Sequence, residues 1–238
     1  MISVICCSNR LDVYESMLKK SALLQYESYE LILLDNTHNQ FSSASKAYNH
    51  GIKKAQGDVL VFAHQDIQFE DPNLFFKIRE AVEETKGLVG VAGIRDKTGV
   101  MTNLIQGEYK SYGGPIQLNR IEKVQTLDEV LFAGSRSTFE TIAFDEVTCD
   151  DWHLYAVDLC LSAALKGIDA YVIPEPIFHK SQGKISLGYA RTLWRLIQKH
   201  RSNYRFIYTT CSIVSTKRLR SIQYVLQLIW DHVIVGRN

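Results

Sequence analysis

Apolar runs of five to seven residues alternate with stretches of helical periodicity over the first hundred residues. The runs are rich in β-branched residues and predict buried strands over 2–8, 29–35, 59–63 and 88–93. Apolar residues at helical spacing predict helices between them, over 10–25, 42–56 and 71–86. Ser42 or Ser43 is expected to cap the second of these helices, and Gly57 to follow its C-terminus as the C′ residue.

This alternation of strands and helices predicts an α/β fold with a doubly wound, mainly parallel sheet. Ligands of such sheets bind beyond the carboxyl ends of the strands. Three of the predicted strands are followed there by hydrogen-bonding side chains: Ser8, Asn9, Asp35, Asn36, His64, Gln65 and Asp66. One such strand end is usually a turn or a helix cap, but three together indicate a binding site.

The first strand–helix turn reads Ser8-Asn9-Arg10-Leu11 and lacks the pattern G-x-G-x-x-G. Its sequence therefore disfavours a nicotinamide, flavin or P-loop site. Without a glycine-rich cradle, a diphosphate needs another source of positive charge. A Mg²⁺ or Mn²⁺ ion held by Asp66 would bridge the phosphate oxygens. His64 or another histidine would join the site if the ion is Mn²⁺.

The composition is that of a globular protein, with 46% hydrophobic and 22% charged residues in 238. The opening MISVICCSNR has no basic segment before its apolar residues, so no signal peptide is predicted. No run of about 18 apolar residues occurs, so no membrane span is expected. The five cysteines lack C-x-x-C spacing and indicate reduced thiols in a cytoplasmic protein.

Charge is distributed unevenly along the chain. From Lys180 onward there are eleven Lys and Arg residues against one acidic residue, Asp231, whereas the rest of the chain is net acidic. This split predicts an anionic partner for the basic segment, either membrane lipid or a phosphorylated acceptor. The alternative is that the basic segment packs on the acidic body of the same chain. No nucleic-acid partner is expected.

Several motifs in order along the chain carry a resemblance to a known family. They are Ser8-Asn9, LILLDNT (31–37), ASKAYNHGIKKAQGD (44–58) and VLVFAHQD (59–66), followed by LFAGSR (131–136), WHLYAVDLCLSAALKG (152–167) and YVIPEPIFHKSQG (171–183). Together they resemble a family 2-type GT-A glycosyltransferase. The closer resemblance is to a bacterial branch in which H-Q-D replaces the metal-binding D-x-D. The resemblance covers about residues 2–183.

The resemblance implies roles for individual positions. Asn9 and Asp35 match positions at the nucleotide base and ribose, and Asp66 matches the metal-binding aspartate. His179 matches a histidine that completes the metal site. The remaining nucleotide and donor contacts implied by position are Ser8, Asn36, Asn49, Lys53, His64 and Gln65. Whether His64 itself binds the metal or only shapes the pocket is left open.

An inverting transfer also needs a general base for the acceptor hydroxyl. Family 2 enzymes usually place it in an acidic motif at the start of a helix, here within FDEVTCDDWHLYAVDLCL. Relatives often read Y-D-x-D-L-C-L where this chain has Ala156, so the first carboxylate of that pair is missing. Asp151 is the first candidate, followed by Asp150 and Asp158. The alternative role for Asp151 is a helix N-cap.

The resemblance divides the chain into a GT-A domain over 1–186 and a basic extension over 187–238, for which two or three helices are predicted. The extension is expected to pack on the catalytic domain, on a second subunit or on a membrane interface. The loops over 94–128 belong to the acceptor side in the family, which makes Tyr109 and Tyr112 candidate sugar-stacking residues.

The expected function is that of an inverting, metal-dependent glycosyltransferase. Its donor is a nucleotide-diphosphate sugar, most simply a UDP-sugar, and its acceptor is a hydroxyl of a glycan or lipid-linked molecule. The setting expected from the resemblance is bacterial surface polysaccharide synthesis, in the cytoplasm or at the inner face of the membrane. Two alternatives are a sugar nucleotidyltransferase and a catalytically silent GT-A domain that acts as a binding partner, the latter because of Ala156.

Overall fold

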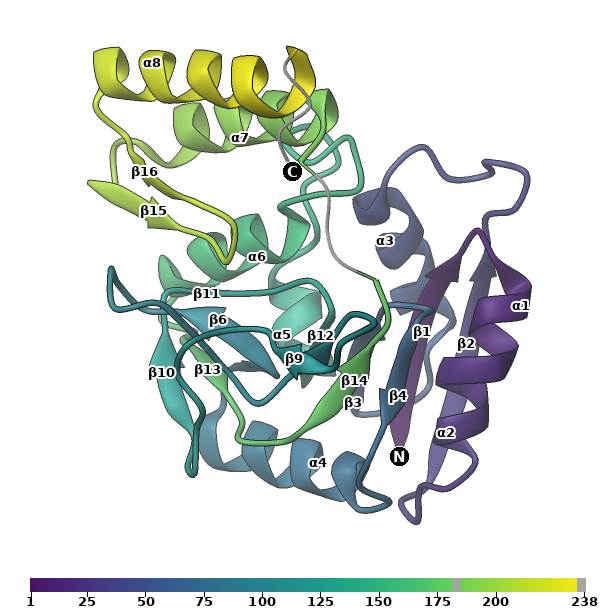
Figure 1. Cartoon of the computed structure of the whole chain (residues 1–238). Helices are drawn as coiled ribbons and strands as arrows, with labels where there is room; N and C mark the ends of the chain where they lie inside the picture. Colours follow the sequence, from purple (N-terminus) through teal and green to yellow (C-terminus); the bar gives the residue numbers. More distant parts are fainter. Residues whose placement is uncertain (182–184, 235–238) are drawn as a thin grey trace.

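The central feature of the fold is a seven-stranded sheet in the order β10-β13-β5-β12-β3-β1-β2 (Figure 1). The structure is a computed structural model and describes residues 1–181 and 185–234. Strands β10 and β12 run antiparallel to their neighbours, and the other five are parallel to one another, as predicted. The strands are β1 (Ile2–Ser8), β2 (Tyr29–Asp35), β3 (Val59–Ala63), β5 (Leu88–Gly90), β10 (Glu122–Val124), β12 (Leu131–Ser135) and β13 (Ala170–Val172).

Helices cover both faces of this sheet because its strands are apolar on both faces. On β3, Val59, Val61 and Ala63 belong to one hydrophobic cluster, whereas Leu60 and Phe62 belong to another, as the two-residue period of a strand requires. One face packs against α1 (Leu11–Tyr14), the π-helical turn η1 (Glu15–Lys19), α2 (Lys20–Ala22) and α4 (Leu74–Thr85). The other packs against α3 (Ala44–Lys54), α5 (Arg136–Thr141) and α6 (Tyr155–Ala164).

Because β12 is antiparallel to β3, it begins at the edge of the sheet where β3 ends. Leu131, at the start of β12, lies opposite Ala63, at the end of β3. Beyond this pair, the His64 N–H donates to the Val130 carbonyl at 3.0 Å. Residues that precede β12 therefore lie at the same edge as residues that follow β3.

Two smaller sheets flank the central one. The first contains β4 (Ile67–Phe69), β14 (Ile177–His179), β8 (Ile105–Gln106) and β9 (Ser111–Tyr112). The second contains β6 (Ala92–Ile94), β7 (Val100–Thr102) and β11 (Thr126–Leu127). The single strand predicted over 88–93 is wrong, because this buried run divides between β5 in the central sheet and β6 in the second small sheet. Both halves are apolar, so hydrophobicity gave no indication of the break at Val91.

The C-terminal extension consists of α7 (Leu187–His200), the hairpin β15 (Phe206–Tyr208) and β16 (Ile213–Ser215), α8 (Arg218–Leu228) and a π-helical turn η2 (Ile229–Ile234). Figure 1 shows α8 stacked on α7, with the hairpin beside α6. Leu193 and Ile197 of α7 pack in one buried cluster with Leu161 of α6. Helices were predicted for this segment, and α7 and α8 are present, but the hairpin between them was not predicted. Its segments FIY and IVS alternate with the two-residue period of strands.

The two ends of α3 differ in how well they were predicted. Ser43 caps the helix as expected, accepting from the Lys46 N–H at 3.3 Å. Gly57 is not the C′ residue, because the helix ends at Lys54 and Ala55 is already extended. Gly57 instead allows close approach to β1: its N–H donates to Ser3 Oγ at 2.7 Å, and a Cβ there would lie 2.6 Å from the Met1 carbonyl oxygen.

A helix that crosses a bilayer needs about 20 predominantly apolar residues. Within residues 1–181 and 185–234, none of the helices combines the length and the apolar character needed to cross a bilayer.

Candidate functional site

A cavity of about 310 Å³, the first cavity, opens at the carboxyl ends of β1, β2 and β3. Parallel sheets bind ligands at this edge, in the crevice that forms where the connections after neighbouring strands run to opposite faces of the sheet. Its lining combines side chains from the strand ends, α3 and the start of α6: Cys7, Asn9, Asn36, Asn39, Ala44, Tyr48, His64, Gln65, Asp66, Trp152, Tyr155 and Ser181. Five of the predicted site residues therefore meet in one place.

Gln65 holds the first strand–helix turn against the end of β3. Its Oε1 accepts from Ser8 Oγ at 2.6 Å and from the backbone N–H groups of Asn9 and Arg10, each at 3.1 Å. Its Nε2 donates to Asn9 Oδ1 at 3.0 Å. Gln65 and Ser8 therefore fix the position of the Asn9 amide at the rim of the first cavity.

Asp35 and Asn36 follow β2, which is in register with β1 so that Asp35 lies opposite Ser8. The buried Asn36 donates its N–H to the Ser8 carbonyl at 2.7 Å, and its side chain bonds the backbone of Phe41. Asp35 accepts from the N–H and hydroxyl of Thr37, which lower the pKa of its carboxyl. Asn36 lines the first cavity, and Asp35 does not.

Asn49 and Lys53 lie on α3, outside the lining of the first cavity. Asn49 Nδ2 donates to the Phe144 carbonyl at 2.9 Å and to Glu146 Oε1 at 2.8 Å, and its Oδ1 accepts from the Phe144 N–H. These bonds join α3 to the segment before α6. Lys53 is exposed to solvent.

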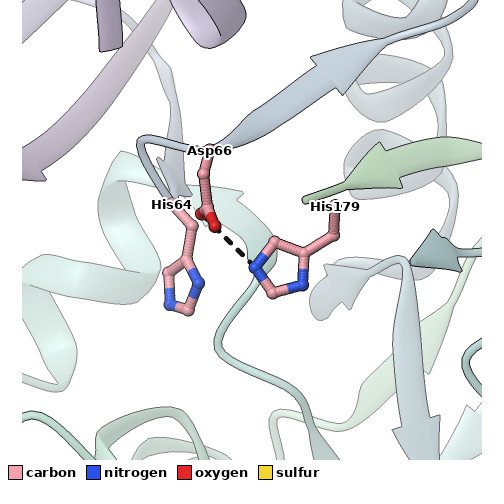
Figure 2. A group of neighbouring side chains, drawn as sticks. All are labelled: His64, Asp66 and His179. Atoms are coloured by element: carbon pink, nitrogen blue, oxygen red, sulfur yellow. Dashed lines mark ion pairs between the residues drawn. The ribbon is translucent and has the colours of Figure 1, made fainter. Parts of the chain in front are cut away.

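His64, Asp66 and His179 form a cluster in which one ligand atom from each lies within 4.8 Å of the others (Figure 2). His179 Nε2 lies 3.3 Å from Asp66 Oδ1. The antiparallel pairing of β4 with β14 brings them together, since His179 lies opposite Ile67 and the Lys180 N–H donates to the Asp66 carbonyl at 3.0 Å. Two segments more than a hundred residues apart therefore converge on one point.

Asp66 and His64 have the protonation states of metal ligands. Burial alone would raise the pKa of Asp66, but hydrogen bonds from His179 and Ser181 outweigh it and lower the pKa below its usual value. Ser181 Oγ donates to Asp66 Oδ2 at 2.5 Å. Burial, together with the neighbouring His179, lowers the pKa of His64 to about 4. At neutral pH the site therefore offers a charged carboxylate and a neutral imidazole.

A second cavity of about 480 Å³ adjoins the first, and His64 and Trp152 line both. Its wall is assembled from segments far apart in the chain, including the loops over 94–128, the turn before α6 and the tip of the β15–β16 hairpin. Its polar lining residues include Asp128, Glu129, His153, His179, Thr209 and Thr210. Asp128 and Glu129 were not predicted from the sequence. The adjacent acidic pair directly before the apolar run of β12 was the available indication.

The three predicted base candidates are engaged with the C-terminal extension. Asp150 Oδ2 pairs with Arg195 at 2.5 Å, and Asp151 Oδ2 lies 3.4 Å from Arg191. Asp151 Oδ1 also accepts from the Trp152 N–H at 2.7 Å. None of the three lines either cavity.

Asp158 is buried beneath α7 and pairs there with two basic side chains. His200 Nε2 lies 2.7 Å from its Oδ1, and Lys199 Nζ lies 2.8 Å from its Oδ2. Lys199 also pairs with Asp145 at 2.9 Å. Part of the basic extension thus pairs with the acidic body of the same chain, the alternative considered from the charge pattern.

The two tyrosines expected at the acceptor side are solvent-exposed. Tyr109 is 91% exposed and Tyr112 is 59% exposed. Neither lines the second cavity, although neighbouring residues of the same loops, such as Leu104, Gln106 and Gly113, do.

Similarity to solved structures defines the class of fold. "GalNAc-T7 with UDP, GalNAc and Mn2+" matches with a TM-score of 0.60 and 10% identity, over 83% of this chain and 47% of that chain. The S. aureus protein "TarS 1-349 in complex with UDP-GlcNAc" matches with a TM-score of 0.57 and 12% identity, over 99% of this chain and 73% of that one. The chain thus spans about half the length of the GalNAc-T7 chain. The predicted GT-A architecture is confirmed.

The family follows from the sequence itself. Residues 3–214 match the model of a family described as "Glycosyltransferase like family", and the chain belongs to this family. The match includes α7 and the β15–β16 hairpin. No curated protein matches the chain in sequence. The predicted membership in a family of glycosyltransferases is confirmed.

Proposed function

We propose that this protein is an inverting, metal-dependent glycosyltransferase that moves a sugar from a UDP-sugar to a hydroxyl of a glycan or lipid-linked acceptor. The carrying observation is the His64–Asp66–His179 cluster, of which His64 and Asp66 line the first cavity together with strand-end amides. Family membership supports the class of reaction. The UDP and Mn²⁺ in the GalNAc-T7 structure and the UDP-GlcNAc in the TarS structure support the donor and the metal.

The cluster fits a divalent ion that accepts both nitrogen and oxygen ligands. Mg²⁺ prefers oxygen ligands alone, whereas two imidazoles and one carboxylate suit a transition-metal ion such as Mn²⁺. Asp66, His179 and His64 would hold it, with Ser181 orienting the Asp66 carboxylate. When bound, such an ion neutralises the negative charge that develops on the departing diphosphate.

The two cavities assign two parts of the reaction to different side chains. In the first cavity, Asn9 and Asn36 present amide groups to the nucleoside, and the buried Tyr48 closes its floor. The second cavity receives the acceptor. Because His64 and Trp152 line both cavities, the transferred sugar lies beside them, between donor and acceptor.

Isothermal titration calorimetry with UDP tests this function. We expect UDP to bind in the presence of Mn²⁺, and EDTA to abolish the binding. ADP and GDP serve as matched controls for base recognition. Mn²⁺-dependent release of UDP from a panel of UDP-glucose, UDP-galactose, UDP-GlcNAc and UDP-GalNAc then identifies the donor sugar. A wild-type protein that does not bind UDP, or that releases UDP from none of these donors, would contradict the proposed function.

The stereochemistry of transfer has a separate test. Azide is a small anionic nucleophile that forms a stable glycosyl azide, so the configuration at its anomeric carbon can be assigned by NMR. Inversion of an α-linked UDP-sugar gives the β-glycosyl azide. Formation of the α-anomer would show retention and would overturn the inverting mechanism.

A lipid-linked acceptor agrees with the surface of α8 and of the turn η2 that follows it. Leu219, Leu226 and Trp230 are exposed, by 78%, 62% and 59%. Arg218 and Arg220 flank Leu219 and are exposed as well. This combination suits the interface of an anionic membrane, which agrees with polysaccharide assembly at its inner face. Flotation with vesicles of phosphatidylglycerol and phosphatidylcholine tests it. A concentration-dependent dimer without vesicle binding would instead assign this surface to a second copy.

A further inference from the structure

The carboxylate that the family places at the start of α6 is absent here, where Ala156 is fully buried. Another acidic pair reaches the same place from a different element. Because β12 is antiparallel, Asp128 and Glu129 approach the edge of the sheet at which β3 ends, next to His64. The site residues predicted at strand ends all follow a strand. Asp128 and Glu129 precede one, so they were not among them.

Glu129 is the member of the pair whose carboxylate remains available. It lines the second cavity, and its Oε1 is buried without a hydrogen-bond partner in the described part of the chain. Asp128, by contrast, accepts from the Val130 N–H at 3.0 Å through Oδ1 and from the Thr210 hydroxyl at 2.5 Å through Oδ2. Asp128 therefore anchors the hairpin, whereas Glu129 has an oxygen free to accept a proton.

The start of α6 is shaped around Glu129. Leu154 has a φ of 65°, a left-handed conformation unusual for a branched side chain. This turn leaves the backbone N–H groups of Leu154, Tyr155 and Ala156 beside the Glu129 carboxylate, where they stabilise its charged form. The carboxylate of Glu129 thus lies against the residue at which the family's own carboxylate is missing.

The geometry points to Glu129 as the general base of the reaction, an inference that rests on the proposed function. Glu129 removes the proton from the acceptor hydroxyl as the acceptor oxygen forms its bond to the anomeric carbon. The bond between that carbon and the diphosphate oxygen breaks at the same time, and its electron pair leaves with UDP. The proton ends on the Glu129 carboxylate.

The surroundings of Glu129 suit this role. Burial first, and then the charge of Asp128, raise the pKa of its carboxyl well above the usual value, while the amides of α6 oppose the rise. Tyr48 of α3, Tyr155 of α6, Cys149 before α6 and Cys211 of the hairpin are the other titratable groups that interact with it. In its ionised form, a carboxylate of raised pKa is a stronger base than an ordinary one.

The test compares E129Q with the wild-type protein, using Mn²⁺, the UDP-sugars that the wild type accepts and water as the acceptor. Glutamine keeps the shape of the side chain and its acceptor oxygen for the α6 amides, but it is not basic. UDP release is expected to fall about 10²- to 10⁴-fold. The affinity for UDP with Mn²⁺ is expected to stay within about twofold of the wild type. E122Q, the same substitution on β10 outside both cavity linings, is the matched control.

Azide makes the role of Glu129 separable from a structural one. It carries no proton to remove, so azide is expected to restore UDP release by E129Q, with a glycosyl azide as product. E129A, which removes the buried polar group, is the second variant if glutamine does not fit, and azide is expected to rescue it as well. Rescue of neither variant by azide would make Glu129 structural.

Three further outcomes would overturn the inference, and each is distinct from failure of the proposed function. Full activity of E129Q would remove Glu129 from the reaction. Loss of activity in D151N, with E129Q unaffected, would return the role to the first candidate from the sequence. Equal loss of UDP binding and UDP release in E129Q would show a structural effect. By contrast, a wild-type protein that neither binds UDP nor releases it contradicts the proposed function itself.

Discussion

The two adjoining cavities are built in different ways. The first takes most of its lining from short motifs at the ends of consecutive strands, within residues 7–66. The second gathers residues from six separate stretches between 64 and 211, including the hairpin of the C-terminal extension. Local motifs thus define the cavity assigned to the donor, whereas tertiary packing defines the one assigned to the acceptor. This arrangement allows acceptor specificity to change through loops and the extension without disturbing the donor site.

The difference extends to the charges in each cavity. In the first, Asp66 is paired with His179 and Ser181 and remains ionised. In the second, Glu129 is half-buried, and its buried Oε1 is unpaired in the described part of the chain. A paired carboxylate suits a metal ligand, and an unpaired one suits proton transfer. The predictions below test this division of roles.

The largest expected effect is the loss of the metal ligand in D66N. Removing this charge deprives the site of several kcal/mol of electrostatic stabilisation, so the affinity for UDP in the presence of Mn²⁺ is expected to fall by about 10³-fold. Calorimetry measures the change. The control is D169N, since Asp169 pairs with Lys123 far from both cavities. Unchanged Mn²⁺-dependent binding by D66N would show that the cluster is not the metal site.

The second cavity is expected to depend on the packing of the extension. Leu193 is fully buried in the cluster that joins α7 to α6. L193A is expected to lower the free energy of unfolding by about 2–5 kcal/mol. Urea denaturation followed by circular dichroism measures it, with L219A on the exposed face of α8 as the control. A loss confined to residues 187–238, with the rest of the domain unfolding as in the wild type, would make the extension an independent unit.

A smaller loss of metal affinity is expected for S181A, which removes the hydroxyl that donates a hydrogen bond to Asp66. Groups that orient a metal ligand typically contribute about 10- to 100-fold to affinity. The affinity for Mn²⁺, measured by calorimetry, is expected to fall in this range, and S202A in an exposed turn is the control. An unchanged affinity would show that Asp66 keeps its orientation without Ser181.

The smallest expected effect is a change in how the free energy of unfolding depends on pH in E129Q. The pKa of Glu129 is raised in the folded state, so the native protein binds this proton more tightly than the unfolded chain. Its contribution to stability is therefore largest in acid and declines as the pH rises above the unfolded pKa. E129Q, which keeps its protons, is expected to gain stability relative to the wild type between pH 5 and 8. Urea denaturation at both values measures the trend, and a constant difference would contradict it.

Much of the fold and of the first cavity could be predicted from sequence. Buried strands and amphipathic helices have distinct periods, and a parallel sheet places its strand ends together, so Asn9, Asn36 and Asp66 were found as one group. His179 was found through the resemblance to the family. Three other predicted residues do not line the first cavity: Asp35, Asn49 and Lys53. Asp35 is held by a hydrogen bond from Thr37, and Asn49 is held by a hydrogen bond to Phe144. Lys53 is exposed to solvent.

The second cavity could not be predicted in the same way. The direction of β12 follows from its pairing with β3 and β5, and nothing in the five residues of LFAGS specifies it. Without the direction of β12, the sequence does not show which edge of the central sheet Glu129 reaches. The hairpin was also not predicted, so Thr210 was not placed beside Asp128. Contacts between segments far apart in the chain decide both points.

The division of roles is tested most directly by measuring UDP binding and UDP release for D66N and E129Q side by side, with Mn²⁺ present. The expected result is that D66N loses both, whereas E129Q binds UDP as the wild type does and loses only the release. If E129Q loses binding as completely as D66N, or if D66N binds UDP as tightly as E129Q, the two cavities do not have separate roles and the account is contradicted.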